Sequence, residues 1–282
     1  MTPYEKALEK ITETVETKRR ILDLRGLNLN DSDFIKLLKE NFELLQPYES
    51  MFGWYQFTEL SSELGGLIKL SSLSLAGNQL KSLPAEIGNL EHLKRLSLDG
   101  NQLSKLPPEI GRLEYLKKLG LAGNQLRSLP AEVRKLKSLT RLSLNDNKIT
   151  YLSSEVGELI NLISLGLDGN KLSSLPVEIK NLKKLKILNL RSNGFTGLPS
   201  EIVELKSLAE LDLGYNPIVN LSAEVLCNLD SNLELYIYNN KLHTVMIGRF
   251  STCFDDYINI GYLKALNKSE QAEQIKLDEI LK

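Results

Sequence analysis

The sequence of 282 residues is poor in the residue types that build metal centres, disulfide frameworks and nucleophilic active sites. It has two cysteines, Cys227 and Cys253, and two histidines, His92 and His243, and neither pair has the spacing of a metal site or a redox motif. The two common phosphate-binding sequences, Gly-x-x-x-x-Gly-Lys-Ser/Thr and Gly-x-Gly-x-x-Gly, are both missing. These absences predict a protein that is not an enzyme and that binds no metal or cofactor.

The sequence also lacks an excess of charge of one sign, long apolar runs and a recognisable secretory leader. The 35 basic and 36 acidic residues leave a net charge of -1, so the chain as a whole has no attraction for nucleic acid. No run approaches the roughly 18 apolar residues that span a bilayer, and residues 1–10 contain no signal-peptide core. The two cysteines are isolated in the sequence, which is typical of a reducing compartment. Together these features predict a cytoplasmic protein. Secretion by a route that needs no signal peptide is the alternative.

The sequence does contain a repeat of 23 residues. Its pattern is Leu-x-x-Leu-x-Leu-x-x-Asn-x-Leu-x-x-Leu-Pro-x-Glu-Ile-x-x-Leu-x-x, and it starts at Leu70, Leu93, Leu116, Leu139, Leu162, Leu185 and Leu208. The asparagines of these units are Asn78, Asn101, Asn124, Asn147, Asn170, Asn193 and Asn216. A period of this length predicts stacked units that share one continuous core, each contributing a short strand.

The unit that begins Leu116-Lys-Lys-Leu-Gly-Leu-Ala-Gly-Asn-Gln-Leu and continues with Leu-Pro-Ala-Glu-Val resembles the 23-residue class of leucine-rich repeats, as in bacterial proteins of the Leptospira and Legionella type. The resemblance implies an α/β solenoid, a horseshoe with a concave parallel sheet, short helical or 3-10 segments on the convex side and helical caps at both ends. It also implies protein binding on the concave face, with a small GTPase or a host protein as partner. Near-identical repeats without cysteine-rich caps favour a bacterial origin.

Four segments are expected along the chain. They are an N-terminal cap helix (residues 1–20), degenerate repeats (21–69), regular leucine-rich repeats (70–244) and a C-terminal cap with a helical tail (245–282). Tyr4, Leu8 and Ile11 have helical spacing, which suits a helix that covers the open end of the stack. Leu27 replaces the asparagine of the first degenerate unit.

The repeat also predicts how each unit folds. Because side chains of a strand alternate between its two faces, Leu96 and Leu98 should point into the core, and Arg95 should point outward. The asparagines should pair with backbone groups at the turn that follows. Proline is expected at the first position of each convex helical turn, with a glutamate two residues later near its positive end.

The outward positions of the strands are the candidate binding site. They start with a basic line, Arg95, Lys118 and Arg141, beside a column of small residues that would let a partner approach the backbone. Toward the C-terminal end the outward residues become acidic and tyrosine-rich. The candidate protein-binding residues are Arg95, Ser97, Asp99, Lys118, Arg141, Asn145, Asp168, Arg191, Glu210, Asp212, Glu234, Tyr236 and Tyr238. The same residues could also serve only to keep an exposed sheet soluble.

We therefore predict a monomeric, non-enzymatic protein-protein interaction module that acts as an adaptor or scaffold, with signalling as its setting. A secreted bacterial effector or host-interaction factor that uses the same face is the alternative. A repeat protein with a purely structural role is the third possibility. Tyr236 and Tyr238 are the best candidates for interface anchors, since aromatic side chains bury a large area at a low entropic cost.

Overall fold

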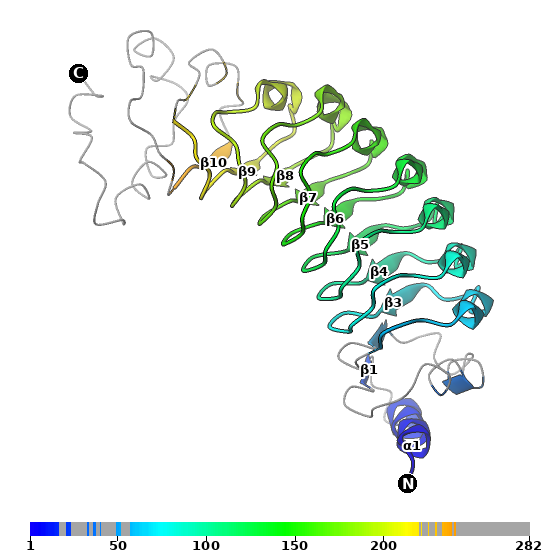
Figure 1. The fold of residues 1–282 in the computed structure, drawn as a ribbon. Coiled ribbons are helices and arrows are strands. Elements are labelled where there is room, and N and C mark those ends of the chain that lie inside the picture. Colours follow the sequence, from blue (N-terminus) through cyan, green and yellow to red (C-terminus); the bar gives the residue numbers. More distant parts are fainter. Residues whose placement is uncertain are drawn as a thin grey trace.

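The computed structural model describes residues 1–16, 21–23, 33, 36, 37, 40, 49–51, 57–219, 221, 225, 229, 233–238 and 240. Within these residues the chain forms one parallel sheet of ten strands, in which each strand pairs with the next one in the sequence. Figure 1 shows the result as an arc with the strands on its inner side. The predicted α/β leucine-rich repeat solenoid is confirmed.

The strands are three residues long. They are β1 (Ile21–Asp23), β2 (Glu49–Met51), β3 (Ser72–Ser74), β4 (Arg95–Ser97), β5 (Lys118–Gly120), β6 (Arg141–Ser143), β7 (Ser164–Gly166), β8 (Ile187–Asn189), β9 (Glu210–Asp212) and β10 (Glu234–Tyr236). In β3 to β9 the middle side chain is buried while its two neighbours lie on the inner surface. Leu96 and Leu98 are buried and Arg95 is exposed, as the alternation predicts.

The outer side of the arc carries short 3-10 helices (Figure 1). They are η1 (Ser62–Gly66), η2 (Ala85–Asn89), η3 (Pro108–Arg112), η4 (Ala131–Lys135), η5 (Ser154–Glu158), η6 (Val177–Asn181) and η7 (Ser200–Glu204). Their buried apolar residues, together with the buried leucines of β3 to β9, belong to a single core cluster that runs the length of the array. A continuous core of this kind is what makes each unit depend on its neighbours.

The asparagines form the expected ladder. The side-chain amide of Asn124 donates to the carbonyls of Leu98 at 2.9 Å and Leu121 at 3.0 Å, and its Oδ1 accepts from the N–H of Leu103 at 3.0 Å. The same contacts recur one repeat earlier and later along the array. Each side chain thus links its own turn to the preceding repeat and satisfies buried backbone groups.

The prolines lie one residue before the position predicted for them. Pro84 precedes η2 with an extended backbone (φ -67°, ψ 150°), and its carbonyl accepts the first bond of the turn, from Ile87 at 3.1 Å. Pro107 and Pro130 do the same before η3 and η4. The turn needs an extended residue with a free carbonyl and no donor, which proline supplies.

The glutamates occupy the first turn of these helices, as expected. In η5 the pKa of Glu155 is lowered, chiefly by a hydrogen bond from its own backbone N–H. A carboxylate held in this way complements the positive end of the turn. The glutamate line on the convex side is therefore part of the fold.

The N-terminal helix α1 (Pro3–Glu16) contacts β1 at the open end of the sheet (Figure 1). Its Ala7 and Ile11 side chains are buried in the common core. Phe57 takes a leucine position in the degenerate region, where it is buried and donates its N–H to Asn78. The C-terminal cap expected in 245–282 lies outside the described residues.

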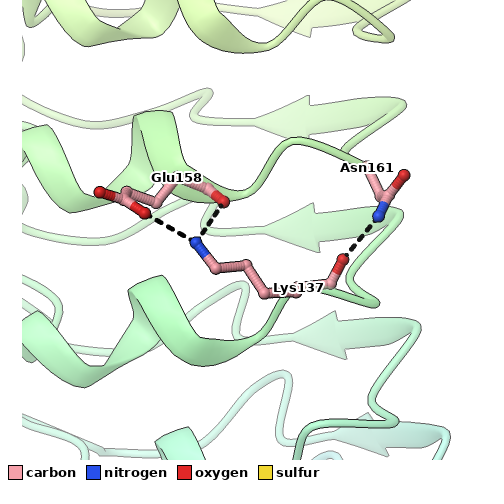
Figure 2. A network of polar contacts seen from close by, with 3 residues as sticks. All are labelled: Lys137, Glu158 and Asn161. Carbon is pink, nitrogen blue, oxygen red and sulfur yellow. Dashed lines mark hydrogen bonds and ion pairs between the residues drawn. The ribbon is translucent and has the colours of Figure 1, made fainter.

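Neighbouring repeats are also joined on the surface. Figure 2 shows the Nζ atom of Lys137 donating to the backbone carbonyl of Glu158 at 3.1 Å and pairing with its carboxylate at 2.7 Å. The side chain of Asn161 donates to the carbonyl of Lys137 at 2.8 Å. Because these groups are solvent-exposed, the ion pair contributes little to stability on its own. Its position on the outer flank leaves the concave face to other side chains.

Candidate protein-binding surface

The predicted site residues all lie on the outward positions of β4 to β10 or within two residues of them, on the concave face. Arg95, Lys118 and Arg141 are exposed. The half-buried members are Ser97, Asp99, Asn145, Asp168, Arg191, Glu210, Asp212, Glu234, Tyr236 and Tyr238. The structure divides this set into a basic row on β4 to β6 and an acidic, aromatic end on β8 to β10.

The basic row consists of Arg95, Lys118 and Arg141, which are direct partners in the register of β4, β5 and β6. Strands in a sheet lie about 4.8 Å apart, so three cations are stacked in one line. The ion pairs between described residues involve neither Lys118 nor Arg141. Like charges directly opposite each other repel, and this repulsion disfavours the pairing of the strands.

More positive charge adjoins the row where the strands begin. Lys94 and Lys117, each one residue before its strand, are exposed. Slightly upstream, the rings of His92 and Tyr115 stack with a centroid distance of 6.5 Å. Tyr115 is 60% exposed, so this pair presents an aromatic surface beside the cations.

Two of the predicted site residues hold the sheet together. Asp99 accepts the backbone N–H of Ala122 at 2.8 Å through Oδ1 and the hydroxyl of Ser97 at 2.6 Å through Oδ2. Asn145 accepts the N–H of Asp168 at 3.0 Å. Each oxygen satisfies an amide just after the strand of the next repeat. Asp99 and Asn145 are therefore committed to the fold.

These contacts also explain the small residues of the middle column. A Cβ atom on Gly120 would lie 2.3 Å from Oδ2 of Asp99, and one on Gly166 would lie 2.6 Å from Oδ1 of Asn145. The glycines make room for the capping side chains of the preceding repeat. The expectation that this column opens a path for a partner to the backbone is wrong at both glycines, because that space is filled.

The C-terminal end of the concave face carries a tyrosine–arginine cluster made of Arg191, Tyr215 and Tyr238. The guanidinium carbon of Arg191 lies 4.6 Å from the ring centroid of Tyr215 and 5.5 Å from that of Tyr238. The two rings meet edge to face at a centroid distance of 5.4 Å. Residues from three successive repeats thus fix one another through cation–π and aromatic contacts.

Two carboxylates, Asp212 and Asp168, interact with this cluster. The hydroxyl of Tyr238 donates to Asp212 at 3.3 Å, and desolvation followed by the Asp212 charge raises the pKa of Tyr238. The pKa of Asp168 is also raised, mainly by burial, although Arg191 opposes the shift. The hydroxyl of Tyr236 donates to Glu234 at 3.0 Å. The end of the sheet is therefore aromatic and rich in negative charge, as the sequence predicts.

Tyr215 is not among the residues predicted for the site, because it lies after β9 on the turn that precedes Asn216. The signal was available, since Gly77, Gly100 and Gly123 occupy the same place in earlier repeats. A tyrosine there breaks the pattern. Its ring is 47% exposed and forms the centre of the cluster.

An open parallel sheet of ten strands, each paired with the next along the chain, defines a solenoid repeat protein. The Leucine-rich repeat region model matches residues 85–162 and 148–247, and the Leucine Rich Repeat model matches residues 69–90. The chain belongs to the leucine-rich repeat family. The comparison with curated proteins gave no match.

Solved structures with the same fold come from several kingdoms. A leucine-rich repeat protein of Leptospira interrogans is 34% identical, with a TM-score of 0.63 over 84% of this chain and 71% of its own. The ectodomain of the Arabidopsis thaliana receptor kinase GASSHO1/SCHENGEN3, in complex with CASPARIAN STRIP INTEGRITY FACTOR 2, is 32% identical (TM-score 0.61; 71% and 25% covered). The Drosophila Toll–Spatzle complex follows at 25% identity (TM-score 0.65; 70% and 28% covered).

Two searches of the described residues gave negative results. No helix in the described part of the chain combines the length and apolarity that crossing a membrane requires. Among the same residues, no group of three or more His, Cys, Asp and Glu side chains could hold a metal ion. Cys227, Cys253 and His243 lie outside the described residues.

Proposed function

We propose that this protein is a non-enzymatic adaptor or scaffold that holds a protein partner on its concave sheet. The observation that carries the proposal is the basic row, Arg95, Lys118 and Arg141. The three cations are exposed and lie in direct register, and an anionic segment of a partner would complement their charge and reduce their mutual repulsion. Two relatives of the same fold are seen in complexes with protein ligands, which supports binding as the function.

The acidic, aromatic end extends the proposed surface toward β10. Between the two ends the side chain of Ile187 on β8 is 39% exposed on the same face. A partner that spans the sheet would meet cations first, then an apolar contact, and then tyrosines among carboxylates. Aromatic and arginine side chains of this kind commonly dominate interface energies. We therefore propose that the binding surface extends from β4 to β10.

Charge reversal of the row is the first test. In the variant with Arg95→Glu, Lys118→Glu and Arg141→Glu, we expect capture of the native partner to fall at least tenfold, since rim and face charges steer and hold an oppositely charged protein. Quantitative affinity capture from the source cells, with wild-type and variant proteins side by side, measures this. Circular dichroism checks that the variant is folded.

The matched control reverses the same number of charges on the convex side, with Arg112→Glu, Lys135→Glu and Lys180→Glu. These side chains are exposed and belong to η3, η4 and η6. We expect capture to stay unchanged in this variant. Loss of the partner in the convex variant together with retention in the concave one would show that the partner binds elsewhere.

A secreted factor that binds a host protein is the second candidate. It is favoured by the similarity to a protein of Leptospira interrogans and to the ectodomain of a plant membrane receptor kinase. On that proposal the partner is a host protein, whereas an adaptor inside a bacterial cell would bind one of its own proteins, for instance a small GTPase. Immunodetection of the protein in culture supernatant and in cell lysate, with a cytoplasmic marker as control, separates the two.

A further inference from the structure

Tyr215 adopts a backbone conformation that its side chain disfavours. Its φ is 55°, in the left-handed region. The residues at the same place in the other repeats also have positive φ angles: Gly77, Gly100, Gly123, Asp146, Gly169 and Ser192. Glycine has no Cβ penalty there and aspartate is tolerated, but a bulky residue is strained. The turn imposes this conformation on all seven of these repeats, and one repeat meets it with a tyrosine. Strain of this kind is retained where the side chain is used.

Burial does not account for the tyrosine. Nearly half of the ring is exposed, and the hydrophobic core lies on the other side of the sheet. The neighbourhood is instead arranged around the ring. Gly214 lacks the Cβ atom that would lie 2.6 Å from Cζ of Tyr238, so Tyr238 can lie over the backbone and meet Tyr215 edge to face. Arg191 covers one side of the pair.

The charge around the pair selects the kind of group that could bind it. Two carboxylates lie at the cluster: Asp212 accepts the hydroxyl of Tyr238, and Asp168 interacts electrostatically with Arg191. Glu210 and Glu234 add negative charge where β9 and β10 begin, and the cations at this end are Arg191 and the exposed Lys186 before β8. An acidic side chain of a partner would be repelled here. A cationic one would be attracted by the carboxylates and could also contact the exposed part of an aromatic ring.

We propose that Tyr215 and Tyr238, with the carboxylates of Asp168 and Asp212 beside them, form a recognition site for a lysine or arginine side chain of the protein partner. The site rests on the proposed function, because it requires a partner on the concave face. Tyr215 would contact the cation directly. Arg191 and Gly214 are positioning residues that hold the rings. The concave face would then bind acidic groups of the partner at the basic row and a basic group at this site.

The test uses two synthetic Gly-Ser peptides of equal length, one carrying lysines and the other glutamates at the same places. Each is titrated into the full-length, isotope-labelled protein and followed by NMR. We expect the lysine peptide to shift the ring signals of Tyr215 and Tyr238, and the glutamate peptide to shift the amides of β4 to β6. In the Tyr215→Gly variant the lysine peptide should bind about tenfold more weakly, with the glutamate peptide unaffected.

Thermal unfolding of the same variant separates recognition from a structural role. Because Tyr215→Gly relieves the left-handed strain, its Tm should stay equal or rise by about 2–4 °C while lysine-peptide binding is lost. Ser192→Gly, at the same place one repeat earlier, is the control: it should leave peptide binding unchanged. A lower Tm for Tyr215→Gly with unchanged peptide affinity would overturn the proposal.

The peptide titrations also distinguish this proposal from the one on which it rests. If the glutamate peptide binds the basic row but the lysine peptide leaves the tyrosine signals unmoved, the cation site is wrong and concave-face binding stands. If neither peptide perturbs any concave residue, both are wrong. Shifts of the tyrosine rings by the glutamate peptide alone would show that Arg191, and not the carboxylates, sets the preference.

Discussion

Replacing Asn124 with alanine is expected to destabilise the protein by about 3 kcal/mol. Asn124 is buried in the middle of the array, with a relative exposure of 6%. The two leucine carbonyls it contacts each have a second asparagine as partner, Asn101 for Leu98 and Asn147 for Leu121. The N–H of Leu103 has no such replacement, because Asn124 Oδ1 is the acceptor that the ladder gives it. A buried donor without a partner costs about 1–3 kcal/mol, and the lost bonds and cavity add to this.

Urea unfolding measures the total loss, and hydrogen exchange at the Leu103 amide reports the local cause. The matched control is Asn181→Ala, the same substitution at an exposed residue of η6, for which we expect a change within about 0.5 kcal/mol. A loss below about 1 kcal/mol with a protected Leu103 amide would contradict the ladder as the source of stability. In that case water would have to satisfy the amide.

The sequence predicted this ladder and the basic row for the same physical reason. Identical units can stack with every leucine buried only if each strand pairs with the next at a shift of one period. A residue therefore lies beside the one 23 positions away, and Arg95 pairs with Lys118 in the register as it does in the repeat. The period thus converts the sequence directly into spatial neighbours across the sheet. For this reason the sequence predicts which outward residues lie side by side on the sheet.

The capping role of Asp99 could not be read in the same way. The period places Asp99 on the concave face, but it does not say which way the carboxylate turns. In the structure it reaches across to the amide of Ala122 and occupies the space above Gly120. That choice depends on a rotamer and on an unpaired donor past the end of the strand. The small residue at position 120 was consequently interpreted as an opening, although it is filled from the neighbouring repeat.

The tyrosine–arginine cluster was partly predictable. The repeat pattern predicts Tyr238 on the concave face if one extra residue is allowed before it. The structure has this extra residue, because β10 pairs with β9 at a shift of 24, with Glu234 opposite Glu210. Tyr215 does not follow, because it lies on the turn, outside the alternation that sorts strand residues into inward and outward. Its left-handed backbone aims the ring toward Arg191. A reading of the turn position across all repeats would have found it.

Replacing Gly157 with alanine should destabilise the protein by about 2–3 kcal/mol, although glycine-to-alanine changes at unstrained positions usually stabilise. A Cβ atom on Gly157 would lie 2.4 Å from the carbonyl oxygen of Glu178 and 2.8 Å from its carbonyl carbon. These are backbone atoms of the next turn, η6, and they cannot rotate away as the end of a side chain can. The added methyl must therefore push two repeats apart on the convex side.

Gly66→Ala is the matched control, because a Cβ atom there meets nothing within 4 Å. We expect it to leave stability unchanged or raise it by up to about 1 kcal/mol in urea unfolding. Equal stability of the two variants would contradict the packing argument.

The spacing that Gly157 sets has a consequence for binding. Helices η1, η2, η3 and η5 have glycine at this place and pack more closely on the next turn than η4 and η6, which carry Arg134 and Lys180. Close packing on the outer side lessens the curvature of the inner side. Spreading the turns at Gly157 should therefore bend the sheet more sharply between β6 and β7, the strands of the repeats that carry η5 and η6. That hinge lies between the basic row and the tyrosine–arginine cluster, so a partner that contacts both should bind the Gly157→Ala variant more weakly, whereas a peptide confined to one end should not.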